Sequence, residues 1–345
     1  MYIKALELLP VVKAVSNPSS QNMASTMKAL RLTREKAGEL PVLSLETLPI
    51  PTLKPNHLLV KVHASAIQPS DILNSKGSFP FTTFPRVPGR DFSGVVVDGP
   101  SSRVGEEVYG TSGFTQAFTV DGAHAEYILV DEHAVAPKPK NLSFVQAAVV
   151  PVPFTTAALA LRRAGAKKED TILVIGATGA VGSAVVQIAR GIGSRVLLAT
   201  RKDDGDVNTS KDPELKALDA VTAGKGIDVI VDTVGQPALT RAAVAKLARG
   251  GRLAFISAPR SGSTELGVEM LDFYRNEKSL IGVNTLKYPV EEFAEELKTL
   301  APKFEADVLK GGAANEWTEV KLEEAVDAYA KASQRGSGKF VVIMG

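Results

Sequence analysis

The stretch TILVIGATGAVGSAVVQIARGIG, residues 171–193, contains two apolar segments on either side of a glycine-rich turn. Its first residues are continuously apolar, which is typical of a buried parallel strand. After the turn, apolar residues recur at helical spacing across residues 184–192, and this pattern indicates one packed face of a helix. Gly176, Gly179 and Gly182 lie between the two segments at a G-x-x-G-x-x-G spacing. The stretch therefore predicts a strand, a tight turn and a helix.

A turn of this kind is typical of a dinucleotide site. Glycines let the backbone approach a pyrophosphate, while Gly182 lets the helix pack close to the strand. The helix N-terminus offers free N–H groups and the positive end of its dipole to phosphates. A tight turn without a ligand is the alternative, but four strand-like segments downstream favour dinucleotide binding. The predicted contacts are Thr178, Gly179, Ala180, Val181 and Gly182.

The end of the next predicted strand, in LLATRKDDGD, bears on which cofactor binds. An NAD site needs an acid there, about 20 residues past the glycines, to bond a ribose hydroxyl. This chain has Thr200 followed by Arg201 and Lys202. A hydroxyl and two cations suit the 2′-phosphate of NADPH. The alternative is a solvated basic loop, because Asp203 and Asp204 follow directly.

Composition and length narrow the class of protein. A chain of 345 residues is long enough for about two domains. The net charge of +2 indicates neither nucleic acid nor a membrane surface as a partner. The absence of cysteine excludes disulfides, thiolate metal sites and cysteine nucleophiles. No apolar run approaches the ~18 residues of a spanning helix, and we expect a cytoplasmic protein.

The pattern changes along the chain. Residues 1–26 read as an extension, which we expect to be disordered or to come from an upstream start. A mitochondrial transit peptide is the alternative, although the segment carries Glu7 and no arginine. Short strand-like segments follow up to about Pro139. From Ser143 onward, helical segments alternate with buried strands, which predicts an α/β fold with a parallel sheet.

Eight motifs carry a family resemblance: VKVHASAIQPSD, VPGRDFSGVV, GAHAEYILV, PFTTAALAL, GATGAVG, IDVIVDTVG, GGRLAFISA and GKFVV. With these motifs in this order, the chain from Met27 onward resembles the zinc-free quinone oxidoreductase and enoyl reductase branch of the medium-chain dehydrogenase/reductase superfamily. The resemblance implies a GroES-like β-rich catalytic domain over 27–150 and 287–345. It also implies a doubly wound Rossmann domain over 151–286, with NADPH and substrate meeting between the two.

The resemblance also bears on zinc. Zinc alcohol dehydrogenases of this superfamily carry Cys-x-Thr-Asp and Gly-His-Glu where this chain has QPSD, residues 68–71, and GRD, residues 89–91. Catalytic zinc needs about three protein ligands, so we predict no metal. Hydride from NADPH would then reduce a quinone or an α,β-unsaturated carbonyl, with the protein orienting both partners.

Further site residues follow from the resemblance alone. It places Thr156 under the nicotinamide, with Ser257, Ala258 and the segment from Ile281 to Val283 around its amide and ribose. The predicted cofactor residues also include Asn208, Val234 and Phe255. Gln68, Ser70 and Asp71 are the predicted residues of the catalytic cleft. As alternatives, Thr156 could cap its own helix, Ser257 and Ala258 could simply end a strand, and Asp71 could bond the loop backbone.

Two departures from the family pattern concern the proton donor and one crossover. Leu73 stands where quinone reductases often have a tyrosine, so we expect the proton to come from solvent, with Ser70 as the alternative. Residues 203–227 are too short for a strand, a helix and a full crossover, because parallel strands usually need a connection of a dozen or more residues. We expect the third strand to be lost or its edge to be rebuilt as a loop.

Two other functions stay open. An enoyl-thioester reductase would need a basic patch at the cleft mouth, for which Lys76, Arg86 and Arg90 are candidates. A non-catalytic NADPH-binding role is the other alternative. The strand RLAFISA, followed by Pro259, is consistent with a homodimer formed through the edge of the Rossmann sheet.

Overall fold

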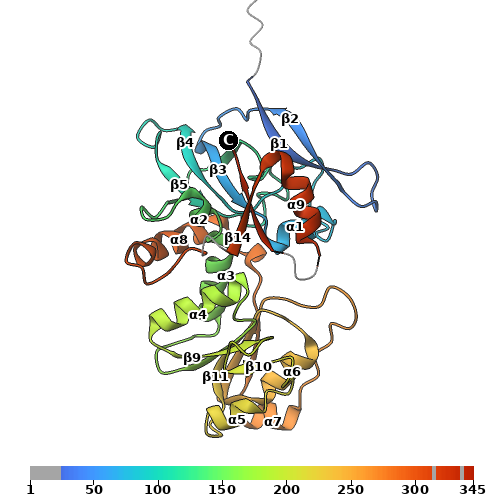
Figure 1. The fold of residues 1–345 in the computed structure, drawn as a ribbon, viewed down its shortest axis with the longest axis vertical. Helices are drawn as coiled ribbons and strands as arrows, with labels where there is room; N and C mark the ends of the chain where they lie inside the picture. The colour runs from blue at the N-terminus through green and yellow to red at the C-terminus, as the bar shows by residue number, and fades with distance from the viewer. Residues whose placement is uncertain (1–24, 313–315, 335–337) are drawn as a thin grey trace, which may run out of the picture.

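The computed structural model describes residues 25–312, 316–334 and 338–345 in two lobes (Figure 1). The predicted extension lies almost entirely outside the described residues. The strands of the first lobe are β1 (Thr26–Thr33), β2 (Val42–Pro49), β3 (His57–Ala66), β4 (Phe92–Asp98), β5 (Glu107–Gly110), β6 (Tyr127–Asp131), β7 (Ala136–Pro137), β14 (Trp317–Lys321) and β15 (Lys339–Ile343). Its helices are α1 (Pro69–Ser75), α2 (Phe144–Ala148), α8 (Val290–Glu305) and α9 (Ala325–Ala332).

The second lobe follows α3 (Pro151–Arg163), the helix that lies between the lobes in Figure 1. Its strands are β8 (Thr171–Ile175), β9 (Arg195–Thr200), β10 (Val207–Asn208), β11 (Ile227–Asp232), β12 (Leu247–Phe255) and β13 (Ser279–Gly282). Its helices are α4 (Ala180–Ile192), α5 (Ala217–Val221), α6 (Pro237–Ala245) and α7 (Met270–Arg275). No helix among the described residues is long and apolar enough to cross a membrane.

The second lobe contains a six-stranded parallel sheet in the order β10-β9-β8-β11-β12-β13. In chain order this is 3-2-1-4-5-6, the arrangement of a doubly wound dinucleotide fold. Residues 172–175 of β8 are fully buried, as a strand covered on both faces must be. The connection reverses direction between β8 and β11, so a crevice opens at the carboxyl ends of these two strands.

The first lobe is built on a seven-stranded sheet in the order β14-β15-β3-β4-β5-β7, with β6 also paired to β3. Its last strands come from the C-terminus, so the tail returns to the first lobe as predicted. The α/β class with a β-rich lobe and a parallel-sheet lobe is confirmed. The boundaries of the domains stay predictions, because α3 and α8 share one apolar core with β8 and α4.

The segment after β9 differs from what the sequence predicts. The third strand is present, but it pairs with β9 over only two residues, Val207 and Asn208. The connecting loop folds back because Leu198 N donates to Asp206 Oδ2 at 2.7 Å and Asp206 N donates to Leu198 O at 2.9 Å. So short a parallel pair forms without a helical crossover. Of the two expected outcomes, loss of the strand is wrong, while the edge is indeed rebuilt by a loop that ends in this two-residue strand.

Candidate functional site

A cleft of about 730 Å³ lies between the lobes, where the carboxyl ends of the parallel strands face α1. Its lining brings together residues that the sequence predicted from both halves of the chain. These are Gln68, Ser70, Thr156, Gly179, Ala180, Val181, Phe255, Ser257, Ala258 and Val283. Thr178, Gly182, Val234 and Ile281 do not line this cleft, although Val234 packs against the glycine turn beside Gly176.

The glycine turn forms one wall of the cleft. Gly179 is the N-cap of α4 and supplies no side chain to the first-turn amides, so the N–H groups of Ala180 and Val181 are left for a ligand. A Cβ on Gly182 would lie 2.1 Å from the Gly176 carbonyl oxygen, so this residue lets the helix approach the strand. A Cβ on Gly179 would meet only that oxygen, at 3.2 Å. The turn therefore fits a pyrophosphate, with Gly182 in a packing role.

Two threonines on α3 divide the roles that the sequence left open. The Thr155 hydroxyl donates to the Pro151 carbonyl within the helix at 2.7 Å. Thr156 lines the cleft instead. The intrahelical bond is therefore made by Thr155, and Thr156 faces the cleft.

The opposite wall begins with QPSD at the start of α1. Gln68 N donates to Asp71 Oδ2 at 2.9 Å, and Gln68 Nε2 donates to Asp91 Oδ2 at 2.9 Å. Asp71 is fully buried and does not line the cleft, so it bonds the backbone as the alternative reading proposed. Ser70, by contrast, is half-buried and its side of the helix turn faces the cleft.

Arg90 completes this wall at the position where zinc enzymes carry a histidine. Its side chain is buried, with Nε donating to Ser112 Oγ at 2.7 Å, Nη1 to Ser70 Oγ at 3.0 Å and Nη2 to Ser112 O at 3.3 Å. The sequence named Arg90 only as a candidate phosphate contact, because its partners Ser70 and Ser112 lie on two segments far from it in the sequence. Sequence reasoning therefore missed the most heavily bonded cation of the cleft.

Two buried carboxyl groups lie behind Arg90. Burial raises the pKa of Asp71 to about 7 and that of Asp91 to about 6, and the Arg90 charge opposes both shifts. Asp71 Oδ1 and Asp91 Oδ1 have no well-formed hydrogen bond, although the nearby Thr111 hydroxyl helps to hold the pKa of Asp91 down. The cluster thus changes charge near neutral pH.

The donors at these positions do not fit zinc. The described residues contain no group of three or more His, Cys, Asp or Glu side chains placed to hold a metal ion. His124, the nearest histidine, is buried between Tyr329 Oη, 2.9 Å from Nδ1, and Ala66 O, 3.3 Å from Nε2. A carbonyl can only accept, so Nε2 carries the proton and Nδ1 accepts from Tyr329. Burial lowers the pKa of His124 to about 4, which keeps the ring neutral.

The predicted adenosine end lies away from this cleft. The Thr200 hydroxyl is buried and lies 2.6 Å from Asp204 Oδ1, and Asn208 Nδ2 donates to Asp203 Oδ1 at 2.8 Å. Both polar groups therefore hold the loop itself. Arg201 and Lys202 are exposed and form no ion pair with any residue that the structure describes. The loop also returns Asp204 to the strand end, where the sequence had suggested that no acid stands.

Several lining residues were not predicted: Leu73, Phe79, Val152, Thr233, Ile256, Arg260, Asn284, Thr285 and Leu286. Those that follow β11, β12 and β13 could have been found, because ligands of such sheets bind at the carboxyl ends of the strands. Phe79 gave no such signal, since it lies in an irregular segment after α1.

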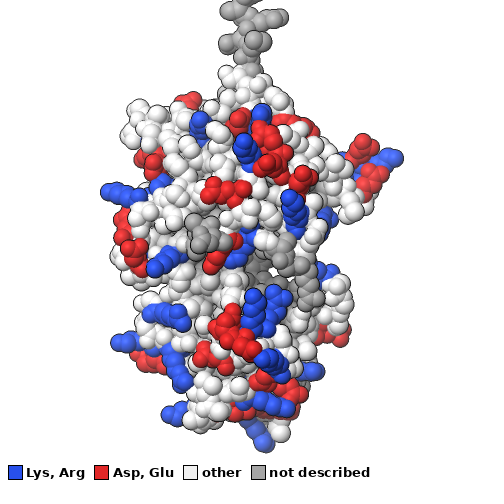
Figure 2. Space-filling view, viewed as in Figure 1, with Lys and Arg blue, Asp and Glu red and all other residues white. Residues whose placement is uncertain are grey.

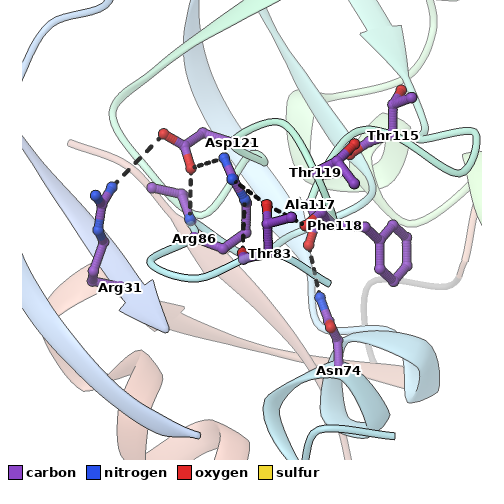
Figure 3. Close-up of polar contacts among 10 residues, drawn as sticks. Arg31, Asn74, Thr83, Arg86, Thr115, Ala117, Phe118, Thr119 and Asp121 are labelled. Carbon is purple, nitrogen blue, oxygen red and sulfur yellow. Dashed lines mark hydrogen bonds and ion pairs between the residues drawn. The ribbon is translucent and has the colours of Figure 1, made fainter. Parts of the chain in front are cut away.

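Two of the three cations proposed for a basic patch at the cleft mouth, Arg86 and Arg90, are bonded to other groups of the protein, whereas Lys76 is exposed. An unpredicted cation, Arg260, lines the cleft. Figure 3 shows Arg86 paired with Asp121, at 2.9 Å, and bonded to Thr83. Arg90 is buried among its own partners, and the charges on the face drawn in Figure 2 are mixed. Figure 3 also shows Asn74 of α1 donating to the Ala117 carbonyl at 2.7 Å, which ties α1 to the loop that carries Phe118.

Comparison with known proteins agrees with this architecture. The model of the alcohol dehydrogenase GroES-like domain matches residues 54–140, and that of the zinc-binding dehydrogenase matches residues 180–302. An alcohol dehydrogenase superfamily protein from Novosphingobium aromaticivorans superposes with a TM-score of 0.79 and 26% identity, covering 92% of this chain and 100% of that one.

The names of three relatives indicate different activities. A zinc-type alcohol dehydrogenase-like protein of Schizosaccharomyces pombe is 44% identical over 92% of this chain and 97% of its own length. Human quinone oxidoreductase is 28% identical over 93% of this chain and 100% of its own. A 2-methylene-furan-3-one reductase of Solanum lycopersicum is 36% identical over 65% of this chain and 61% of its own. The chain therefore belongs to the medium-chain dehydrogenase/reductase superfamily of oxidoreductases, whose members bind NAD(P).

Proposed function

We propose that this protein is an NADPH-dependent oxidoreductase that reduces a quinone or an α,β-unsaturated carbonyl compound without zinc. One observation carries the proposal: a single cleft has a dinucleotide-type helix N-terminus on one wall and Gln68, Ser70 and Arg90 on the other. Gln68 and Arg90 stand where zinc enzymes of the superfamily carry a cysteine and a histidine, and Ser70 stands where they carry a threonine. A substrate in this cleft would meet hydrogen-bond donors in place of a Lewis acid.

Different residues of the cleft would bind the cofactor and the substrate. The first-turn amides of α4 would hold the pyrophosphate, and Thr156, Ser257, Ala258 and Val283 would hold the nicotinamide end. NADPH supplies a hydride when it is bound. Leu73, Phe79 and Leu286 would contact the apolar body of the substrate and keep water away from it. Holding donor and acceptor in contact is the larger contribution of such a site, worth several orders of magnitude in rate.

The relatives named above support a quinone or an enone as substrate class, since one is a quinone oxidoreductase and another a furanone reductase. An enoyl thioester is less well supported, because Arg86 is ion-paired and Arg90 is buried. A purely NADPH-binding role differs from reduction of a quinone, an enone or an enoyl thioester because it involves no turnover.

The test is NADPH oxidation by purified protein with a quinone, an enone and an enoyl thioester offered separately. We expect turnover with a quinone or the enone, and little with the thioester. Preferred turnover of the thioester would favour the second enzyme function. Tight NADPH binding without turnover on any acceptor would instead support the binding role and contradict the proposal.

A further inference from the structure

The cleft contains a buried cation, Arg90, that donates a hydrogen bond to a serine on the cleft wall. Arg90 is only 4% exposed, yet it lines the cleft. Ser112 engages two of its nitrogens, and the third bonded nitrogen, Nη1, donates to Ser70 Oγ at 3.0 Å. The Phe118 ring lies 5.9 Å from the guanidinium carbon and covers another side. The guanidinium is therefore fixed, and it donates to the Ser70 hydroxyl on the wall of the cleft.

Ser70 itself retains a hydrogen to donate. Its oxygen accepts from Arg90, and none of the described residues accepts a bond from its hydroxyl. An oxygen that accepts from a cation becomes a stronger donor, because hydrogen bonds in a chain polarise one another. The hydroxyl is half-buried and opens on the same cleft as Thr156 and Val283.

We infer that Ser70, polarised by Arg90, is the group that binds the carbonyl oxygen of the substrate and stabilises the negative charge which develops there. The inference rests on the proposed function and deepens it, since it names the atom that replaces the Lewis acid. In this scheme Ser70 is a catalytic residue and Arg90 is a positioning residue, because it acts through Ser70.

The electron balance shows where such a group would act. Addition of a hydride to the β-carbon of an enone forms a C–H bond and breaks the C=C π bond, while the nicotinamide is oxidised. The displaced electron pair ends on the carbonyl oxygen as an enolate, and a proton from water later completes the reduction. Ser70 keeps its proton and only donates a hydrogen bond. A single donor aimed at such an oxyanion is worth about 10²–10³ in rate.

The contrary interpretation is that Arg90 only neutralises Asp71 and Asp91, whose carboxyl groups lie behind it. On that interpretation Ser70 is a helix residue without chemical importance. The two interpretations differ in what Ser70→Ala would do, since this change leaves the charges of the cluster intact. They differ also for Arg90→Lys, which keeps the positive charge but cannot reach both Ser112 and Ser70.

The experiment uses binding of 4-nitrophenol, whose phenolate resembles an enolate and absorbs visible light. It is titrated into full-length protein, with and without NADP⁺, at a pH near the pKa of the free phenol. Wild type should bind the phenolate in preference to the phenol. Ser70→Ala and Arg90→Lys should each weaken phenolate binding about tenfold. Ser75→Ala is the matched control, because Ser75 lies on the same helix, bonds the Ile72 carbonyl at 2.9 Å and does not line the cleft.

Enone reduction is measured on the same four proteins. Ser70→Ala should lower kcat about a hundredfold with little change in the KM for NADPH. Wild type that fails to bind the phenolate, or variants that match Ser75→Ala in both readouts, would overturn the inference. Phenolate binding that depends on Ser70, in a protein without turnover, would uphold the anion site and refute the proposed function. If Arg90→Lys fails to fold, Ser70→Ala alone decides.

Discussion

Asp71 is the residue whose charge state couples the cleft to pH. Its carboxyl group faces Arg90, Asp91, the Gln68 amide and Tyr329, and burial raises its pKa to about 7. Below that pH the carboxyl is protonated and neutral. As pH rises through about 7, a negative charge appears behind Ser70 and opposes the charge that develops on the substrate oxygen.

We therefore expect kcat/KM for an enone to fall as pH rises through about 7. Asp71→Asn cannot acquire this charge, so its profile should be flatter over the same interval. Asp98→Asn, on the exposed end of β4, is the control and should keep the wild-type profile. A wild-type rate that rises across this interval would contradict the electrostatic account.

His124 gives a prediction about stability, which should fall as the pH falls, whereas the rate should fall as the pH rises. Its folded pKa of about 4 lies below the ordinary histidine value of 6.5, so the unfolded chain binds a proton more readily. The stability that it contributes is present above pH 6.5 and is lost as pH falls toward about 4. The loss amounts to about 3 kcal/mol. Urea unfolding of wild type, His124→Asn and the exposed control His133→Asn measures it. Equal pH dependence in all three would refute the assignment.

Single residues were predictable where their role is local. Ser70 and Thr156 belong to short motifs, and both line the cleft. Asp71 was assigned to the same site, but the capping bond to Gln68 turns it into the interior. The role of Arg90 depends on Ser112, a residue 22 positions away, and no local pattern indicates that pairing.

At the scale of elements, the turn between β8 and α4 gives a matched pair of variants. A side chain at Gly182 would press on the Gly176 carbonyl at 2.1 Å, whereas one at Gly179 would meet it only at 3.2 Å. Gly182→Ala should therefore lower the free energy of unfolding by about 1–3 kcal/mol.

Gly179→Val should keep most of its stability and lose NADPH affinity, because the branched side chain occupies the phosphate space. Thermal unfolding and a fluorescence titration with NADPH separate the two effects. A folded Gly179→Val protein with wild-type affinity would mean that the turn is not the phosphate site.

The loop after β9 tests cofactor choice. Arg201 and Lys202 are exposed and unpaired within the described chain, while Asp203 and Asp204 are occupied by Lys211 and Thr200. Two charge-assisted contacts to a 2′-phosphate would contribute about 3 kcal/mol, and solvent screening reduces this. We expect at least a tenfold preference for NADPH over NADH.

The measurement is kcat/KM with each cofactor for wild type and an Arg201→Ala, Lys202→Ala double variant. The variant should lose most of the preference while its NADH activity changes little. The control Arg249→Ala, on β12, should keep the preference. A wild type that favours NADH would show that Asp204 returns to the strand end as a ribose-binding acid.

Periodicity predicted the long elements of both lobes, because buried strands and amphipathic helices carry strong patterns. The two-residue strand β10 could not be predicted in this way. It exists because the Asp206 side chain and backbone both bond Leu198 across the loop. A contact of that kind depends on loop geometry and leaves no periodic signal.

For the whole molecule, the alternation of elements predicted an α/β fold with a parallel sheet, and the family resemblance added the two lobes, the doubly wound topology and a tail that returns to the first lobe. The strand order adds what the alternation could not, namely that β8 and β11 lie side by side and open a crevice toward α1. That crevice brings residues from both lobes into one cleft. Under the proposed function, the wall with Arg90 would determine what kind of electrophilic assistance a substrate receives there.

The central claim is reduction by NADPH without zinc, and one measurement addresses it directly. Protein purified without a metal-affinity step is treated with a chelator, its zinc content is determined, and NADPH oxidation with a quinone and an enone is recorded. The account predicts substoichiometric zinc and undiminished turnover after chelation. One zinc per chain, with turnover lost on chelation and restored by added zinc, would contradict it.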